Sequence, residues 1–254
     1  MRCDPTWRRA RRAGQLAALC IVLLAAGCGR SDDTAGSDAP TPTPSMYATP
    51  GASAETTPAE TFAPEEPPAP EPPSDDELVR VADYIPGIFV ELRYATADNF
   101  TGSVVYDFQD ARLRYGTVKK LAAAQAALLE QGCSLKIWDA YRPVSAQYAL
   151  WALCPDARYV ANPNTGFSSH SRGNTVDVTL VSADGTELEM PSGFDEFSAL
   201  ADRDYSDVSE TARRHAELLE QIMAACGFVP YSAEWWHYAD EAVYDVVWEP
   251  AEAA

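Results

Sequence analysis

The stretch SSHSRGNTVD, residues 168–177, joins a serine- and glycine-rich loop carrying His170 to a β-branched run carrying Asp177. The β-branched residues 175–181 predict a strand that begins at the end of this stretch. An aspartate between two valines in an apolar strand is costly to bury unless it is paired or bound to a metal. A histidine nitrogen and a carboxylate oxygen suit zinc, which needs at least one further protein ligand.

A second stretch, EWWHY at residues 234–238, offers that ligand in His237. The remaining histidine, His215, lies in the middle of a predicted helix beside two arginines, where we expect it to be solvated. Two histidines and one carboxylate leave a fourth position for water, which is typical of catalytic zinc. The simpler alternative stays open on spacing alone: the aspartate caps a turn and the histidine is hydrogen-bonded in its loop.

Two further polar residues have the chemistry for hydrolysis. Glu234 precedes His237 by three residues among bulky tryptophans, where desolvation and a cation would tune its pKa for proton transfer. Arg142 precedes a proline in DAYRP, residues 139–143, so its backbone is held extended and its guanidinium could stabilise an oxyanion. The alternatives are a surface glutamate beside structural tryptophans and an internal Arg–Asp pair.

The periodicity predicts an α+β domain with a small, largely antiparallel sheet and flanking helices. Helices are expected over residues 112–131, 145–153 and 210–226, and glycines end the first and the last. Strands are expected over 135–138 and 175–181, in the region 228–238, and as short pieces within 81–94.

The N-terminus predicts export. Five arginines precede the apolar run Leu16–Ala26, which is too short to span a bilayer comfortably, and small residues lead to Cys28. This pattern resembles a bacterial lipobox, so we expect a signal peptide over 1–27 and a lipid on Cys28; secretion after a neighbouring cut is the alternative. Residues 28–74, rich in Pro, Thr and Ala, predict a disordered tether, and residues 75–254 the catalytic domain.

Charge and cysteine content narrow the partners. The chain carries a net charge of −19, and residues 1–27 hold five arginines and one aspartate, net +4, which leaves −23 on the remainder. Such acidity argues against nucleic acid or anionic headgroups as partners. Cys133, Cys154 and Cys226 allow at most one intramolecular disulfide between them, and spacing does not choose the pair.

Several motifs in order resemble the zinc D,D-peptidases. Residues 168–177 match SxHxxGxAxD, except that Thr175 replaces the alanine, and residues 234–237 match ExWH. The similarity is greater to the D-alanyl-D-alanine dipeptidases of the vancomycin-resistance type. It rests also on RYAT (93–96), DNFTG (98–102), WDAYRP (138–143) and FD (194–195), and it runs from about Tyr84 to Tyr238.

The resemblance implies one Zn²⁺ per chain and a role for each site residue. It assigns His170, Asp177 and His237 as zinc ligands, Glu234 as general base and then acid, Arg142 as transition-state stabiliser, Tyr94 and Asp195 to the substrate ammonium, and Ser168 and Tyr106 to its carboxylate.

The implied activity is hydrolysis of the D-alanyl-D-alanine dipeptide to two D-alanines. A D,D-carboxypeptidase that trims peptidoglycan stem peptides is the alternative, and it suits an exported protein. A second alternative, from another functional class, is a non-catalytic binding lipoprotein that zinc stabilises. We expect the protein at the outer face of the bacterial cytoplasmic membrane, which it contacts only through the lipid anchor. The alternative is secretion into the medium.

Overall fold

The computed structural model describes residues 71–248. The predicted signal peptide, the predicted lipidation site Cys28 and nearly all of the predicted tether lie outside these residues. Within the described range, no helix combines the length and apolar character needed to cross a bilayer.

The centre of the domain is a five-stranded sheet in the order β2-β4-β5-β7-β6. Its strands are β2 (Phe89–Val90), β4 (Cys133–Asp139), β5 (Thr175–Ser182), β6 (Phe228–Pro230) and β7 (His237–Asp240). Only β2 and β4 pair in parallel; the other neighbours are antiparallel. A separate two-stranded ladder joins β1 (Leu78–Arg80) to β3 (Arg112–Arg114). The predicted α+β class and largely antiparallel sheet are confirmed.

Strand register already places two of the predicted ligands together. In the β5–β7 ladder, Asp177 lies directly opposite His237. On the other side of β5, a register shift near the end of β4 sets Asp139 opposite Asp177. Side chains opposite each other in an antiparallel pair are close neighbours. The sheet therefore gathers functional side chains from β4, β5 and β7 at one position along the strands.

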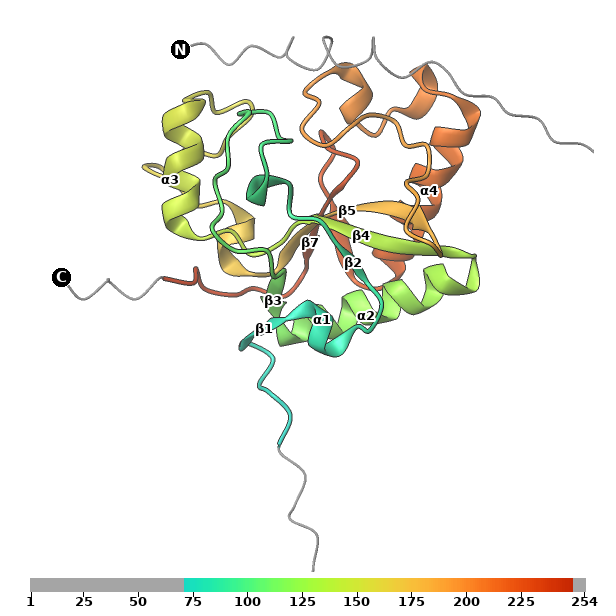
Figure 1. The fold of residues 1–254 in the computed structure, drawn as a ribbon, viewed down its shortest axis with the longest axis horizontal. Coiled ribbons are helices and arrows are strands. Elements are labelled where there is room, and N and C mark those ends of the chain that lie inside the picture. Colours follow the sequence, from blue (N-terminus) through green and yellow to red (C-terminus); the bar gives the residue numbers. More distant parts are fainter. Residues whose placement is uncertain (1–70, 249–254) are drawn as a thin grey trace, which may run out of the picture. The chain divides into compact units, whose positions relative to one another are not determined.

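Four α-helices accompany the sheet: α1 (Val81–Tyr84), α2 (Tyr115–Glu130), α3 (Val144–Leu153) and α4 (Glu210–Ala225). In Figure 1, α2 and α3 lie on opposite sides of the strands. Helix α2 packs against β4 and α4, and α4 packs against β6. Ser209 is the N-cap of α4, and its side chain accepts a hydrogen bond from the Ala212 N–H at 3.0 Å.

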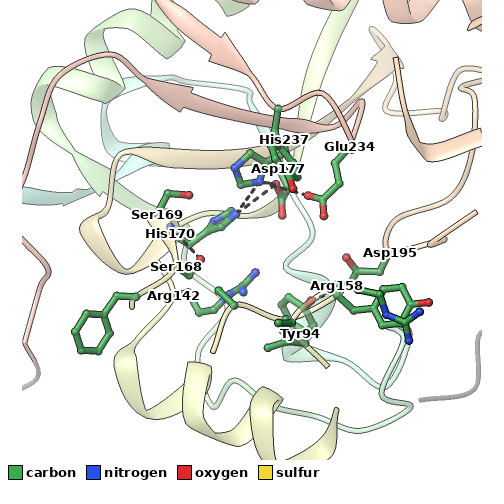
Figure 2. A pocket seen from close by; sticks show the side chains of 16 residues that line it. Tyr94, Arg142, Arg158, Ser168, Ser169, His170, Asp177, Asp195, Glu234 and His237 are labelled. Carbon is green, nitrogen blue, oxygen red and sulfur yellow. Dashed lines mark hydrogen bonds and ion pairs between the residues drawn. The ribbon is translucent and has the colours of Figure 1, made fainter. Parts of the chain in front are cut away.

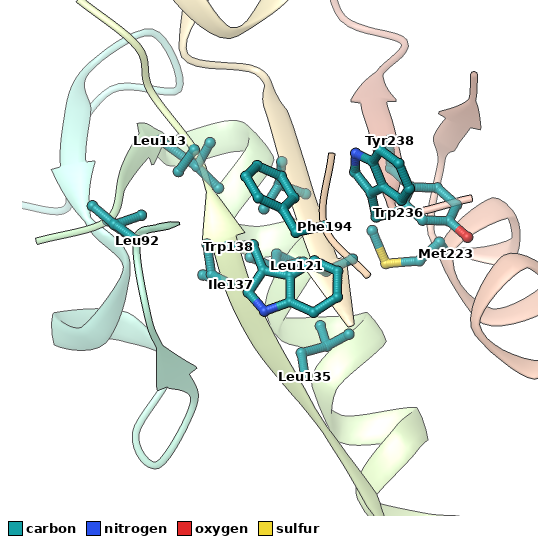
Figure 3. Packing of buried hydrophobic residues seen from close by; sticks show 14 of the residues in the cluster. Leu92, Leu113, Leu121, Leu135, Ile137, Trp138, Phe194, Met223, Trp236 and Tyr238 are labelled. Atoms are coloured by element: carbon teal, nitrogen blue, oxygen red, sulfur yellow. The ribbon is translucent and has the colours of Figure 1, made fainter. Parts of the chain in front are cut away.

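The core combines aliphatic side chains, Leu121, Leu135 and Ile137 among them, with the aromatic rings of Trp138 and Phe194 (Figure 3). Trp235 and Trp236, in the loop between β6 and β7, and Tyr238, in β7, are fully buried. The Trp235 indole N–H donates to the Ser192 hydroxyl at 2.9 Å, which satisfies its one polar atom. These aromatics anchor the loop that carries Glu234.

Three segments differ from the sequence predictions. Residues 81–94 contain the single-turn α1, the two-residue β2 and a 3₁₀ turn at Arg93–Ala95 rather than only short strands. The helix expected from 112 starts at Tyr115, because residues 112–114 pair with β1 instead. The region 228–238 is a hairpin, β6 and β7, whose loop carries Glu234.

Candidate metal centre and substrate pocket

His170 is held by a 3₁₀ turn, Ser169–Arg172. The turn is capped by Ser168, whose hydroxyl accepts from the His170 N–H at 3.3 Å, and it ends at Gly173, which has φ = +74°. A left-handed residue is needed there, and glycine adopts it without strain. The Gly173 N–H donates to the His170 carbonyl at 3.0 Å. The serine- and glycine-rich sequence therefore fixes the backbone that presents His170.

Three donor atoms converge. The Nε2 of His170 lies 3.4 Å from Asp177 Oδ1 and 3.3 Å from His237 Nδ1, and His237 Nδ1 lies 3.0 Å from Asp177 Oδ1. A set of ligand atoms from these three residues lies within 4.8 Å of one another. Figure 2 shows the three side chains turned toward one point at the edge of the pocket.

The chemistry of these donors fits zinc. Asp177 Oδ1 is buried and has no hydrogen-bond partner in the described chain, because the 3.0 Å approach to His237 lacks hydrogen-bond geometry. Nδ1 of His170 lies 2.7 Å from the carbonyl oxygen of Ala140, so Nδ1 carries the proton and Nε2 presents a lone pair. Two imidazole nitrogens and an otherwise orphaned carboxylate oxygen form a three-ligand zinc set.

The Asp177 carboxylate is ionised at neutral pH. Burial favours its neutral form, but interactions with His170 and His237 outweigh burial and hold the pKa of Asp177 well below its usual value. A buried carboxylate that stays ionised requires a cationic partner. A divalent cation between the three side chains meets that requirement without protonating either ring.

Glu234 stands beside this centre, on the β6–β7 loop. Its Oε2 lies 3.6 Å from His237 Nδ1, and its side chain is 23% exposed. Burial raises the pKa of Glu234 to about 7 in the metal-free chain. A carboxyl with a pKa near neutrality is suited to accept and return a proton.

Arg142 faces the same pocket from the end of β4. Its Nε and Nη2 donate to Asp139 Oδ2 at 3.1 and 2.7 Å, and Nη1 donates to Gln147 Oε1 at 3.0 Å. Three of its five N–H groups are thus used, and the side chain is only 10% exposed. The Arg–Asp pair considered as an alternative is present, and it fixes a guanidinium that still lines the pocket.

Tyr94 and Asp195 form the opposite wall. The Tyr94 hydroxyl donates to Asp195 Oδ2 at 2.8 Å, and the guanidinium carbon of Arg142 lies 5.1 Å from the centre of the Tyr94 ring. Asp195 has φ = +52°, a conformation that non-glycine residues adopt at an energetic cost and that gathers at functional sites. Burial raises the pKa of Asp195 to about 7. The chain thus holds a strained, buried acid against the pocket.

Of the two residues expected near the substrate carboxylate, one reaches the pocket. Ser168 lines it, whereas Tyr106 does not. The Tyr106 hydroxyl donates to Asp139 Oδ1 at 2.8 Å, behind Arg142. In this arrangement Tyr106 orients Asp139, and through it Arg142, instead of contacting substrate.

The pocket has a volume of about 310 Å³ and includes residues that the sequence analysis did not identify. Arg158 and Tyr159 come from the loop after α3, Phe167 from the segment before Ser168, and Tyr231 from the β6–β7 loop. These residues belong to none of the motifs, and only the tertiary fold brings their loops to the metal ligands. His215 lies away from the centre and contacts the Glu189 carbonyl, as expected for a non-ligand.

Among residues 71–248, no cysteine belongs to this centre. Cys133 and Cys226 are free thiols, so they do not form a disulfide with each other. The three-residue His170, Asp177 and His237 cluster is the metal-ligand group found among residues 71–248.

Comparison with known proteins identifies the family of the chain. A family model of the peptidase M15 class, described as D-Ala-D-Ala dipeptidase, matches residues 74–248. The D-alanyl-D-alanine dipeptidase of Escherichia coli K12 is 41% identical over 162 residues, which cover 64% of this chain and 83% of that protein. The enzymes of the same name from Streptomyces coelicolor and Enterococcus faecium are 37% and 33% identical, covering 62% and 64% of this chain and 88% of each relative. The chain therefore belongs to the D-alanyl-D-alanine dipeptidase family of zinc metallopeptidases.

Proposed function

We propose that this chain hydrolyses the D-alanyl-D-alanine dipeptide to two D-alanines, with one zinc ion held by His170, Asp177 and His237. The observation that carries the proposal is the convergence of these three donors at a pocket that also presents Glu234. The family to which the chain belongs and the names of its relatives support the same substrate.

Each side chain at the site has a separate role in hydrolysis. His170, Asp177 and His237 would hold a zinc ion, which would supply Lewis-acid chemistry and make water at the site more acidic. Glu234 accepts a proton from the attacking water and returns it to the departing amine. Arg142, fixed by Asp139 and Gln147, directs its remaining N–H groups at the oxyanion of the tetrahedral intermediate.

Substrate length is set by the far wall of the pocket. Asp195, held by the Tyr94 hydroxyl, pairs with the free ammonium of a dipeptide. A longer peptide has an amide at that position, which carries no charge to offset the buried carboxylate and adds bulk. Exclusion of such peptides distinguishes a dipeptidase from a carboxypeptidase.

The test compares two substrates with the zinc-loaded full chain. We expect turnover of D-alanyl-D-alanine and little or none of a stem pentapeptide that ends in D-Ala-D-Ala. Turnover of only the pentapeptide would contradict the proposal and establish the carboxypeptidase alternative. Binding of either peptide without turnover would establish the non-catalytic alternative.

We also propose that the protein works outside the cytoplasm, anchored by a lipid on Cys28. The arginine-rich head, the short apolar run and the small residues before Cys28 support this. In a bacterial host fed labelled palmitate, the full chain should carry label in the membrane fraction, Cys28→Ser should lose it, and the control Cys20→Ser should keep it. Equal labelling of the parent and Cys28→Ser would contradict lipidation at this residue.

A further inference from the structure

Glu234, in the loop between β6 and β7, and His237, the first residue of β7, are joined to Tyr231 by long backbone hydrogen bonds, while Trp235 and Trp236 between them bond the backbone of Ala201 and Val178. Three backbone bonds link Tyr231, Glu234 and His237 in a closed ring: Tyr231 N–H to the His237 carbonyl at 3.2 Å, Glu234 N–H to the Tyr231 carbonyl at 3.3 Å, and His237 N–H to the Glu234 carbonyl at 3.3 Å. All three bonds are near the long end of the normal range. The ring alone is therefore a poor restraint on Glu234 and His237.

One arginine from a distant segment contacts every carbonyl of this ring. Arg203 Nε donates to the Tyr231 carbonyl at 2.8 Å, and Nη2 donates to the carbonyls of Glu234 and His237, both at 3.1 Å. Each carbonyl thus accepts one backbone N–H and one guanidinium N–H. Hydrogen bonds from a charged donor are stronger than neutral ones, so the guanidinium reinforces each of the three long backbone bonds at its acceptor.

The same guanidinium is itself fixed. Its Nη1 donates to Glu220 Oε2 on α4 at 2.9 Å and to the Tyr238 hydroxyl at 3.2 Å, and its carbon lies 4.7 Å from the centre of the Tyr238 ring. With these contacts all five N–H groups of Arg203 have acceptors. The side chain is 11% exposed, so its orientation is determined by the protein and not by solvent.

From this geometry we propose that Arg203 is a positioning residue for the reaction, one that sets the backbone from which Glu234 and His237 reach the metal centre. The inference rests on the proposed function for its catalytic consequence. The planar fork of a guanidinium matches three carbonyls that face one side of the loop, whereas an ammonium has three donors and no such fork. Arg203 does not contact the metal-binding atoms of His170, Asp177 or His237, and it does not line the pocket. It acts on the site through the backbone carbonyls that it binds.

The experiment uses the full chain with Arg203→Gln, Arg203→Lys and the control Arg213→Gln. Arg213 also lies next to α4 carboxylates, Glu210 and Glu217, but on the surface and away from the loop. Three quantities are measured: zinc affinity by competition with a chelator, kcat and KM for D-alanyl-D-alanine, and the unfolding midpoint.

We expect Arg203→Gln to weaken zinc binding by about 10-fold or more, as loss of groups that orient a ligand does. In Arg203→Gln we expect kcat to fall at least as much as zinc affinity, while KM changes little. Arg203→Lys should show part of both losses. The control Arg213→Gln should behave as the parent. If Arg203→Gln does not fold, Arg203→Lys decides by the same measurements.

A lower unfolding midpoint with unchanged zinc affinity and kcat would show that Arg203 only stabilises the fold and would overturn the proposal. Zinc affinity is read without turnover. A parent that binds zinc but cleaves nothing therefore refutes the proposed function and leaves the positioning role to be judged on zinc affinity.

Discussion

At the scale of single residues, Glu234 is the side chain that distinguishes a hydrolase from a zinc-stabilised binding protein. Glu234→Gln keeps the size of the side chain but cannot accept a proton. We expect kcat for D-alanyl-D-alanine to fall by about 100- to 10,000-fold, the usual contribution of a general base, with zinc content unchanged. The exposed Glu241→Gln is the matched control. A Glu234→Gln variant with kcat within tenfold of the parent would remove Glu234 from the mechanism.

Asp195 gives the second residue-level prediction. Asp195→Asn removes the charge that pairs with the substrate ammonium, so kcat/KM for the dipeptide should fall by about 10- to 100-fold, the equivalent of one hydrogen bond to a charged group. Because burial raises the pKa of Asp195 to about 7, the parent KM should rise as pH falls below 7, and the variant KM should not follow. The exposed Asp207→Asn should match the parent. A normal dipeptide KM for Asp195→Asn would contradict this role.

At the scale of elements, the turn that presents His170 depends on Gly173. An added Cβ there would meet Leu78 Cδ1 at 2.9 Å. The backbone of Gly173 is also left-handed, with φ = +74°, a conformation that other residues adopt only at a cost. We expect Gly173→Ala to lower the free energy of unfolding by about 1–2 kcal/mol, the cost of left-handed backbone for an L-residue, in a denaturant titration. At Gly166 an added Cβ meets nothing within 4 Å and φ is not positive, so Gly166→Ala is the control. Equal stability of the two variants would show that the turn tolerates a side chain.

The elements that the sequence predicted are those specified by local pattern. The helices α2 and α4 are each followed closely by a glycine, and β5 is rich in β-branched residues, so each could be recognised from neighbouring residues alone. The start of α2 was misplaced because β3 exists only through its ladder with β1, where Leu78 pairs with Arg114 across the chain. Short strands of this kind are decided by tertiary pairing, which single-sequence periodicity does not contain.

The same distinction holds for the site. His170, Asp177, Glu234 and His237 lie in two compact motifs, and the fold brings them together as those motifs implied. The pocket loop after α3 and the Arg203 contacts escaped prediction because their role comes from which distant segments they touch. Tyr106 shows the converse, since the family resemblance implied a substrate contact and its hydroxyl instead donates to Asp139.

At the scale of the whole molecule, zinc should stabilise the fold as well as the reaction. Its ligands come from a turn, β5 and β7, so binding links the centre of the sheet. Free zinc at 100 times its dissociation constant should add about 2.7 kcal/mol to the free energy of unfolding, and a chelator should remove it. His237→Ala should lose this dependence and His215→Ala should keep it. An unfolding midpoint indifferent to zinc in the parent would contradict a zinc centre built from these residues.

The most direct test of the account is a zinc titration of the chelator-stripped full chain, with D-alanyl-D-alanine turnover as the readout. We predict negligible turnover without metal, a linear rise as zinc is added and a plateau at one zinc per chain, with no rise in the His170→Ala variant. Full turnover by the stripped chain, or a plateau reached equally by His170→Ala, would contradict it.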